Sequence, residues 1–316
     1  MARRKRGNPV HGWVNLAKPL NLGSTDAVTR VRRLFNAQKA GHAGTLDPLA
    51  TGVLPIALGE ATKTVPFVQD GSKTYRFTVA WGATTTTLDR EGVVVSSSDR
   101  RPSVPEVEAA LPALTGEISQ VPPAFSAIRV DGERAYDLAR AGQAVELQPR
   151  TVHVHALRVV EGAHADQVTL EADCGKGTYV RALARDLAAA LGAEAHVSAL
   201  RRTRVGPFRA EDAIALETLL DLGYERAASE GLLPVETALD DIPALAVTNE
   251  DAFRLSQGRS IVLLPRQVET LRTELGLDAD SGASRVVSAM AGTRIVALGE
   301  LKAGRVEPVR VFNLNS

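Results

Sequence analysis

The sequence has few of the residues that build disulfide-linked, zinc-bound or membrane-spanning proteins. Its 316 residues include one cysteine, Cys174, which excludes an internal disulfide and a cysteine-cluster zinc site. No apolar run approaches the roughly 18 residues that a membrane-spanning helix needs, and no secretory apolar segment follows the first residues. We therefore expect a protein of a reducing cytoplasm that has no membrane partner.

Sequence motifs for common cofactors are also missing. We find no Walker loop, no Gly-x-Gly-x-x-Gly after a strand, no HExxH and no serine nucleophile elbow. His153 and His155 alternate along a predicted strand but have no third ligand, so we interpret them as ordinary sheet residues. The sequence thus predicts neither a bound metal nor a cofactor.

Charge is balanced overall but unevenly distributed. The chain has 37 basic and 37 acidic residues, and 30 of the basic residues are Arg. Basic residues gather in the first six positions and in two acid-free stretches inside 26–47 and 194–211, whereas 211–241 holds nine acids and one Arg. Such blocks can present a basic face to a polyanion. Solvated surfaces would show the same pattern, so charge alone leaves nucleic-acid binding open.

The composition predicts a folded chain with two domains. Apolar residues make up 44% and charged residues 23% of the chain, which excludes a disordered, collagen-like or coiled-coil protein. Residues 1–9 are predicted to form a basic flexible arm, and residues 10–243 the main domain. After the acidic stretch and Ile242-Pro243, residues 244–316 have the short strands and turn signals typical of a small β-barrel-like module.

Hydrophobic spacing predicts the α+β class for the main domain. Residues 73–81 alternate cleanly between apolar and polar side chains, which indicates a strand. A helix is expected near 24–35, with Ser24 as its N-cap, and a later helix is expected to stop at Gly192. Long antiparallel-looking strands are mixed with helices without regular βαβ alternation, which argues against a doubly wound fold.

The segment 41–52, GHAGTLDPLATG, has an unusual composition for a short loop. Its glycines permit positive φ and close approach of the backbone to a ligand. Asp47 is the lone acid in a broad basic neighbourhood, and the surrounding positive charge favours its ionised form. An ionised and positioned carboxylate can act as nucleophile or base. A tight loop with an Asx-type turn would explain the same residues.

The segment 41–52 closely resembles the signature loop of pseudouridine synthases, in particular that of the bacterial TruB family. Four further blocks match the family in the same order. They are NLAKP at 15–19, KTYRF at 73–77, GTYVR at 177–181 and LRRT at 200–203. Spaced blocks in a fixed order are a far more specific signal than any single motif. The module at 244–316 resembles the PUA domain that commonly closes members of this family.

The resemblance implies a fold and an activity. The fold would be the pseudouridine synthase fold, with a mixed, largely antiparallel sheet, flanking helices, a thumb-like insertion at about 120–150 and a PUA-like RNA-binding domain. The activity would be isomerisation of uridine to pseudouridine at position 55 in the T-loop of tRNA, after the base is flipped out. This reaction needs no cofactor. The chain would work as a monomer on the T-arm of tRNA, with no obligate protein partner.

The resemblance also assigns roles to individual residues. Asp47 matches the family's essential aspartate, Tyr75 the tyrosine that stacks on the target base, and Arg181 the arginine that pairs with the aspartate. His42 matches the histidine that wedges into the vacated space. The remaining residues match the pocket wall or would contact phosphates: Lys18, Tyr179 and Leu200 for the pocket, and Arg30, Arg33, Arg201 and Arg202 for the phosphates.

Other interpretations of these residues stay open at this point. Tyr75 is also explained as a core aromatic of an alternating strand, and Arg181 as a surface residue beside a helix stripe. Asn21 stands where the family usually has Gly, but Asn tolerates the left-handed backbone that the turn needs.

Other functions for the whole chain are a non-catalytic RNA-binding or RNA-folding protein of the same fold, or a synthase acting on another RNA. A carboxylate glycosidase would need a second paired acid, and no block supplies one.

Overall fold

The computed structural model describes residues 7–126, 128–130, 132–143, 145–164, 166–275 and 286–314. Residues 1–6 of the predicted basic arm lie outside this range. In the described part of that arm, Asn8 forms a β-bridge with Ala37. No helix among these residues is long and apolar enough to cross a membrane.

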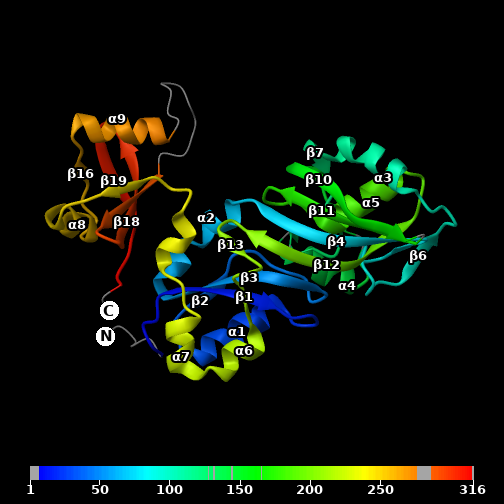
Figure 1. Cartoon of the computed structure of the whole chain (residues 1–316), viewed down its shortest axis with the longest axis horizontal. Coiled ribbons are helices and arrows are strands. Elements are labelled where there is room, and N and C mark those ends of the chain that lie inside the picture. Colours follow the sequence, from blue (N-terminus) through cyan, green and yellow to red (C-terminus); the bar gives the residue numbers. More distant parts are fainter. Residues whose placement is uncertain are drawn as a thin grey trace.

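One large mixed sheet organises the main domain (Figure 1). Its central strands pair antiparallel, except for β1 with β14 and β3 with β12, which run parallel. From edge to edge the strands are β14 (Ile214–Ala215), β1 (Gly12–Lys18), β3 (Ala50–Leu58), β12 (Ala195–Val205), β4 (Lys73–Trp81), β11 (Gln167–Cys174), β10 (Arg150–His164) and β7 (Gly116–Gln120), with β2 (Ala40–His42) beside β3 and β13 (Phe208–Arg209) beside β12.

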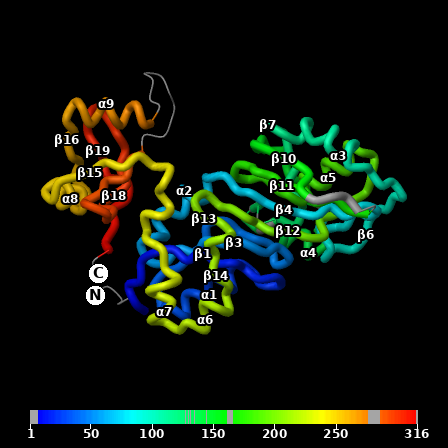
Figure 2. The backbone as a smooth tube through the Cα atoms, viewed as in Figure 1, coloured from blue at the N-terminus to red at the C-terminus, as the bar shows by residue number. Residues whose placement is uncertain are grey.

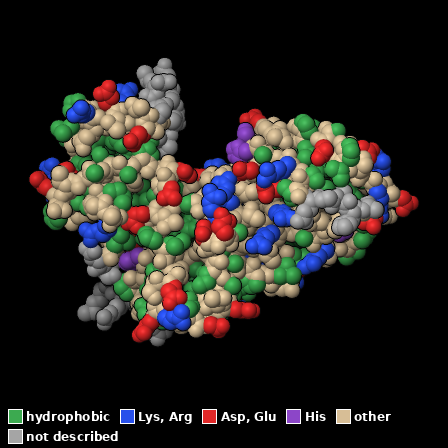
Figure 3. Space-filling view, viewed as in Figure 1, with side chains coloured by type: hydrophobic (Ala, Val, Ile, Leu, Met, Phe, Trp, Pro, Cys, Tyr) green, Lys and Arg blue, Asp and Glu red, His purple; other side chains and the backbone are tan. Residues whose placement is uncertain are grey.

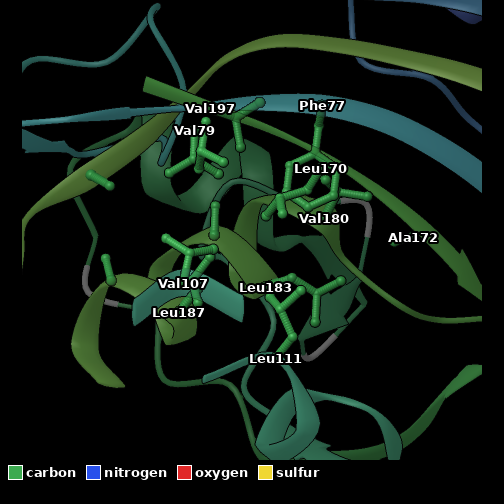
Figure 4. Packing of buried hydrophobic residues seen from close by; sticks show 14 of the residues in the cluster. Phe77, Val79, Val107, Leu111, Leu170, Ala172, Val180, Leu183, Leu187 and Val197 are labelled. Carbon is green, nitrogen blue, oxygen red and sulfur yellow. The ribbon is translucent and has the colours of Figure 1, made fainter. Parts of the chain in front are cut away.

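Strand β4 confirms the alternation expected for residues 73–81. Phe77, Val79 and Trp81 are buried on one face, where they pack against the helix α5 (Val180–Ala190), the helix α3 (Val104–Ala110) and the 3-10 turn η2 (Leu111–Leu114). Figure 4 shows Leu183 and Leu187 of α5 inserted beneath these strands. Each fully buried leucine contributes about 1.5–3 kcal/mol of transfer free energy. Gly192, just after α5, has φ +62°, as expected for a helix stop.

A second core lies on the same face of the sheet, against strands β1 and β3. It is closed by three helices: α1 (Ser24–Leu34), α6 (Leu216–Asp221) and α7 (Gly223–Glu230). Leu200 of β12 and Tyr75 of β4 pack against both cores. These two residues therefore mark the line between the two halves of the domain.

The remaining short elements lie around this sheet. The 3-10 turn η1 (Gly59–Lys63) follows β3 directly and leads into α2 (Val65–Asp70). Two small two-stranded sheets pair β5 (Ala83–Thr85) with β6 (Val94–Ser97), and β8 (Arg129–Val130) with β9 (Glu133–Arg134). The latter pair and α4 (Ala135–Arg140) lie within the stretch predicted to be a thumb-like insertion.

The described residues of the C-terminal module form a second, five-stranded sheet with two helices. Its strands run in the order β15 (Ala244–Ala246), β17 (Val286–Ala291), β18 (Arg294–Lys302), β19 (Arg305–Val311) and β16 (Ile261–Val262), and its helices are α8 (Asn249–Ser256) and α9 (Pro265–Glu274). Figure 2 shows the chain entering this module at β15, beyond the segment that follows α7. The module stands beside the main domain, and it has a core of its own.

Two backbone positions shape the site region. Asn21 adopts φ +61°, so the residue that replaces the expected Gly does take the left-handed conformation. Gly52 has φ +101°, and a Cβ atom there would lie 2.1 Å from the carbonyl oxygen of Arg202. Only glycine permits β3 and β12 to approach this closely.

Candidate active site

A pocket of about 340 Å³ opens where the two halves of the main domain meet. Tyr75 and Leu200, the residues that touch both cores, line it together with the loop that carries Asp47. Segments far apart in the sequence thus meet here. The other lining residues are Gly44, Thr45, Leu46, Gln69, Lys73, Ser126, Gly175, Lys176, Gly177, Thr178, Tyr179, Val180, Arg181 and Arg202.

The loop between β2 and β3 is held in place by side chains from three other segments. The Ser24 hydroxyl donates to the carbonyl of Leu46 at 2.8 Å and accepts from its N–H at 2.9 Å. Ser24 was expected to be the N-cap of α1, but Gly23 takes that position and Ser24 lies inside the helix. Its hydroxyl is used to fix the loop instead.

Lys18 holds the other end of this loop. Its buried ammonium group donates to the carbonyls of Leu22 at 2.8 Å, Pro19 at 2.9 Å and Pro48 at 3.4 Å. Burial lowers the pKa of Lys18 to about 8, although the nearby Asp47 carboxylate opposes the shift. Lys18, which was expected to be a pocket residue, does not line the pocket but fixes Pro48, the residue that follows Asp47.

Arg202 is buried inside the main domain, where it cannot contact a phosphate. Its side chain is 1% exposed. The guanidinium donates to the carbonyls of Val53 at 2.8 Å, Gly44 at 3.0 Å and Thr45 at 3.3 Å. Arg202 was expected to contact RNA phosphates, but its position makes it a brace for the Asp47 loop. Along β12, Leu200 and Arg202 alternate with Arg201, which is exposed.

Asp47 and Arg181 form an ion pair within the pocket. An Arg181 terminal nitrogen lies 2.9 Å from Asp47 Oδ2. The Asp47 side chain is 41% exposed and faces the opening, whereas that of Arg181 is 8% exposed. The guanidinium also donates to the carbonyls of Thr87 at 2.8 Å and Phe125 at 2.9 Å. These contacts exclude the interpretation of Arg181 as a surface residue, because its donors are fixed on three sides.

A second carboxylate, Asp89, completes this network and is missed by sequence reasoning alone. Asp89 Oδ2 lies 3.6 Å from the Arg181 guanidinium, and its side chain is 12% exposed. Its other oxygen accepts from the Thr87 hydroxyl at 2.5 Å and from the N–H of Glu91 at 3.0 Å. The only signal in the sequence is an acid that follows a run of four threonines, which does not indicate a partner 92 residues further along the chain.

The two tyrosines form part of the pocket wall. Burial raises the pKa of Tyr75, although the charge of Arg202 opposes the shift, so the phenol keeps its proton at neutral pH. Burial likewise raises the pKa of Tyr179. The backbone N–H of Tyr179 donates to Gln120 Oε1 at 2.8 Å, which fixes the turn just before α5. Both rings therefore supply neutral, partly apolar surfaces.

His42 ends strand β2, at the entrance to the Asp47 loop. Burial, aided by the charge of Arg202, lowers the pKa of its imidazole, so the ring is neutral at pH 7. Its Nδ1 atom is buried and has no hydrogen-bond partner among the described residues. An unsatisfied buried nitrogen is costly, which suits a residue that gains a partner when a ligand arrives.

The remaining predicted residues lie outside the pocket. Arg30 and Arg33 are exposed on the outer face of α1, as the helical spacing predicted. Arg201 pairs in register with Arg76 of β4. Figure 3 shows basic side chains over the region of β4, β11 and β12, interleaved with acidic ones. Within the part of the chain that the structure describes, no three His, Cys, Asp or Glu side chains are grouped to share a metal ion.

Comparison with known proteins identifies the family. A family model described as TruB family pseudouridylate synthase (N terminal domain) matches residues 32–180, and one for the tRNA pseudouridylate synthase B C-terminal domain matches residues 181–240. The chain belongs to the TruB family of pseudouridine synthases. In the structure the two matched segments share one sheet, because β12 lies between β3 and β4.

Relatives of this TruB-family chain match over almost its whole length. The tRNA pseudouridine synthase B of Caulobacter vibrioides is 67% identical over 314 residues, which cover 99% of this chain and 100% of the relative. The protein of the same name from Rhodospirillum rubrum is 49% identical, with the same coverage of both chains. A solved chain from a Cbf5-Nop10-Gar1 complex superimposes with a TM-score of 0.71 at 26% identity, covering 96% of this chain and 85% of that one.

These similarities confirm the predicted pseudouridine synthase fold and its α+β class. The matches to the two family models together extend from residue 32 to residue 240. The PUA-like character of residues 244–316 therefore stays a prediction, as do the roles of the individual site residues.

Proposed function

We propose that this TruB-family chain isomerises uridine to pseudouridine at position 55 in the T-loop of tRNA, in the bacterial cytoplasm. The observation that carries the proposal is the Asp47–Arg181 ion pair, which faces a pocket walled by Tyr75 and Leu200. The relatives named tRNA pseudouridine synthase B favour tRNA over another RNA.

The product has the same atomic composition as the substrate. The bond between ribose C1′ and uracil N1 breaks, the uracil turns within the pocket, and C1′ bonds to C5. The proton of C5 is lost, and N1 gains one. No electron leaves or enters, so the pocket must provide binding, orientation and proton transfer.

Asp47 is the residue that acts on the substrate in this proposal. Its carboxylate is the most exposed member of the ion pair, and Arg181 holds it in one orientation through Oδ2. The other oxygen then remains available to the pocket, as a nucleophile toward the sugar or as a base. Both roles require the ionised carboxylate, which is also the form that pairs with the Arg181 guanidinium at 2.9 Å. Asp89 and two backbone carbonyls hold the Arg181 guanidinium in place.

The uncharged side chains of the pocket wall would bind the base. Tyr75 would stack on the flipped uracil, with Leu200 as an apolar surface and Tyr179 at the edge. Flipping costs a few kcal/mol of unstacking. His42 would offset part of this cost by stacking in the space that the flipped base vacates.

The tRNA would extend from the pocket over other surfaces of the chain. Arg30 and Arg33 on α1 and Arg201 on β12 would contact phosphates, because their side chains are exposed. The C-terminal module would act as a PUA-like RNA-binding domain. It has a hollow of about 520 Å³ whose lining includes Phe253 and Arg294, an aromatic ring and a guanidinium of the kinds that bind RNA. We expect a monomer that needs no protein partner.

A tritium-release assay tests the proposal. A T-arm hairpin carrying tritium at uracil C5 of the target uridine should release its label when incubated with the protein. A matched hairpin whose labelled uridine lies in the stem should release none. Absence of release from the T-loop uridine, with protein that binds the hairpin, would refute catalysis and favour a purely RNA-binding role.

A further inference from the structure

The C-terminal module is joined to the main domain through two carboxylates that accept its backbone N–H groups. Glu60 of η1 accepts from the N–H of Asn313 at 2.8 Å. Glu236, in the 3-10 turn η3 (Val235–Leu239), accepts from the N–H of Ile295 at 2.8 Å. Hydrogen bonds with an ionised partner are about twice as strong as neutral ones. The two bonds fix two different strand ends of the module.

Lys63 adds a cation to the first of these contacts. Its ammonium group pairs with Glu60 and donates to the carbonyl of Val311 at 2.7 Å. It also lies 5.8 Å from the centre of the Phe312 ring, within the range of a cation–π contact. Burial alone would raise the pKa of Glu60, but the hydrogen bonds from Lys63 and Asn313 outweigh it and leave the pKa lowered. The Glu60 carboxylate is therefore ionised at neutral pH.

An apolar core surrounds these polar contacts. Ile295, Leu298 and Phe312 of the C-terminal module are buried in the same cluster as Trp13 and Val53 of the main domain. Domains within one chain move relative to each other unless their interface is hydrophobic and extensive. Here the packed cluster and the two carboxylate contacts together resist such motion.

Strand β3 directly connects the Asp47 loop to the turn that carries Glu60 and Lys63. Asp47 lies three residues before the strand, and Glu60 lies two residues after it. The nine residues Ala50–Leu58 extend over about 26 Å at the usual rise of a strand. The strand is central in the sheet and almost wholly buried, so it sets a constant separation between the two ends.

The turn after β3 is held in one conformation by close contacts with Val10 and His11. Gly59 has φ +55°, and a Cβ atom there would lie 2.2 Å from His11 Nδ1 and from the carbonyl of Val10. The N–H of Glu60 donates to the same His11 nitrogen at 3.2 Å. The chain before β1 therefore clamps the turn that presents Glu60 and Lys63 to the C-terminal module.

We propose that Glu60 and Lys63 are positioning residues that hold the C-terminal module at a set distance and orientation from Asp47, so that one tRNA binds to both at once. The inference rests on the proposed function, because it concerns how the tRNA substrate is bound. Two linked binding surfaces raise affinity only if their spacing permits simultaneous contact. A module held in place also loses less freedom when the RNA binds.

Steady-state kinetics on two substrates test this inference. Whole tRNA reaches both surfaces, whereas an isolated T-arm hairpin reaches the pocket alone. We expect Glu60→Ala and Lys63→Met to raise KM for whole tRNA by about tenfold, with kcat changed less than about twofold. Both constants for the hairpin should match those of the wild type. Glu60→Gln, which keeps an acceptor for Asn313, should recover part of the loss.

Glu307→Ala is the matched control. Glu307 pairs with Lys302 at 3.2 Å on the exposed surface of the C-terminal module, and among the described residues its side chain forms no ion pair with the main domain. Its KM for whole tRNA should stay at the wild-type value.

An unchanged KM for whole tRNA in Glu60→Ala and Lys63→Met would overturn the inference, as would an equal loss on the hairpin. If Glu60→Ala does not fold, Lys63→Met decides alone, because it removes only the Lys63 contacts. A wild-type protein inactive on both substrates would instead refute the proposed function.

Discussion

Replacement of Arg181 by methionine tests the role of the ion pairs that Arg181 forms with Asp47 and Asp89. The substitution keeps an unbranched side chain of similar length on the first turn of α5 but removes the guanidinium. Asp47 loses the cation 2.9 Å from Oδ2, and the carbonyls of Thr87 and Phe125 lose their donors. Asp89, whose side chain is 12% exposed, is left facing an apolar group.

Two magnitudes follow from these contacts. Breaking a buried ion pair by removing one partner costs about 3–5 kcal/mol of unfolding free energy. Because Asp47 is partly exposed, most of this loss comes from Asp89 and the two carbonyls. For catalysis, a carboxylate that drifts by about 1 Å loses about 100-fold in rate, and we expect at least this decrease in the single-turnover rate of Arg181→Met. Arg181→Lys should recover part of it, because an ammonium group is a single point charge and cannot span both carboxylates.

The assay is single-turnover tritium release, with urea unfolding of the same preparations. Arg185→Met is the matched control, since Arg185 lies one turn along α5 and donates to the carbonyl of Val121 without touching Asp47. A folded Arg181→Met protein with a wild-type rate would refute the reasoning and leave Arg181 a purely structural residue.

Three further predictions concern the loop and its supports. Asp47→Asn should abolish pseudouridine formation while tRNA affinity, measured by filter binding, stays within a few-fold, because the amide keeps the size but not the charge. Gly52→Ala should lower the free energy of unfolding in urea by about 2–3 kcal/mol, since its Cβ would lie 2.1 Å from the Arg202 carbonyl oxygen; an unchanged midpoint would contradict this close approach of β3 and β12. Burial lowers the pKa of Lys18 from 10.5 to about 8, so between these values the unfolded chain binds more protons than the folded one and stability rises with pH. From pH 7.5 to 9.5 the wild type should therefore gain about 1–2 kcal/mol relative to Lys18→Met, and equal pH profiles would refute the assignment.

The sequence predicts the parts of the fold that depend on local periodicity. The alternation in residues 73–81 appears as β4, and Gly192 follows α5 with positive φ. Arg30 and Arg33 are exposed because helical spacing alone determines which face of α1 they occupy. The Asp47–Arg181 contact was expected from the family resemblance rather than from spacing, since 133 residues separate the two in the sequence.

Contacts made after the chain folds are the part that periodicity does not reveal. Asp89 joins the site only because its loop reaches Arg181, and Ser24 leaves its expected capping role because Leu46 lies within reach of its hydroxyl. Arg202 could have been assigned an inward position, because it shares a strand face with Leu200. Its positive charge led to the prediction of a phosphate contact. In the structure its guanidinium instead donates hydrogen bonds to three backbone carbonyls, two in the Asp47 loop and one in β3.

Site-resolved mapping of pseudouridine tests directly whether this protein modifies position 55 of tRNA by means of Asp47. An unmodified tRNA transcript is incubated with the wild-type protein or with Asp47→Asn, and every uridine is then assigned by chemical labelling and mass spectrometry. We expect one pseudouridine per tRNA, at position 55, with the wild type and none with Asp47→Asn. Modification at other positions by the wild type, or at position 55 by Asp47→Asn, would contradict it.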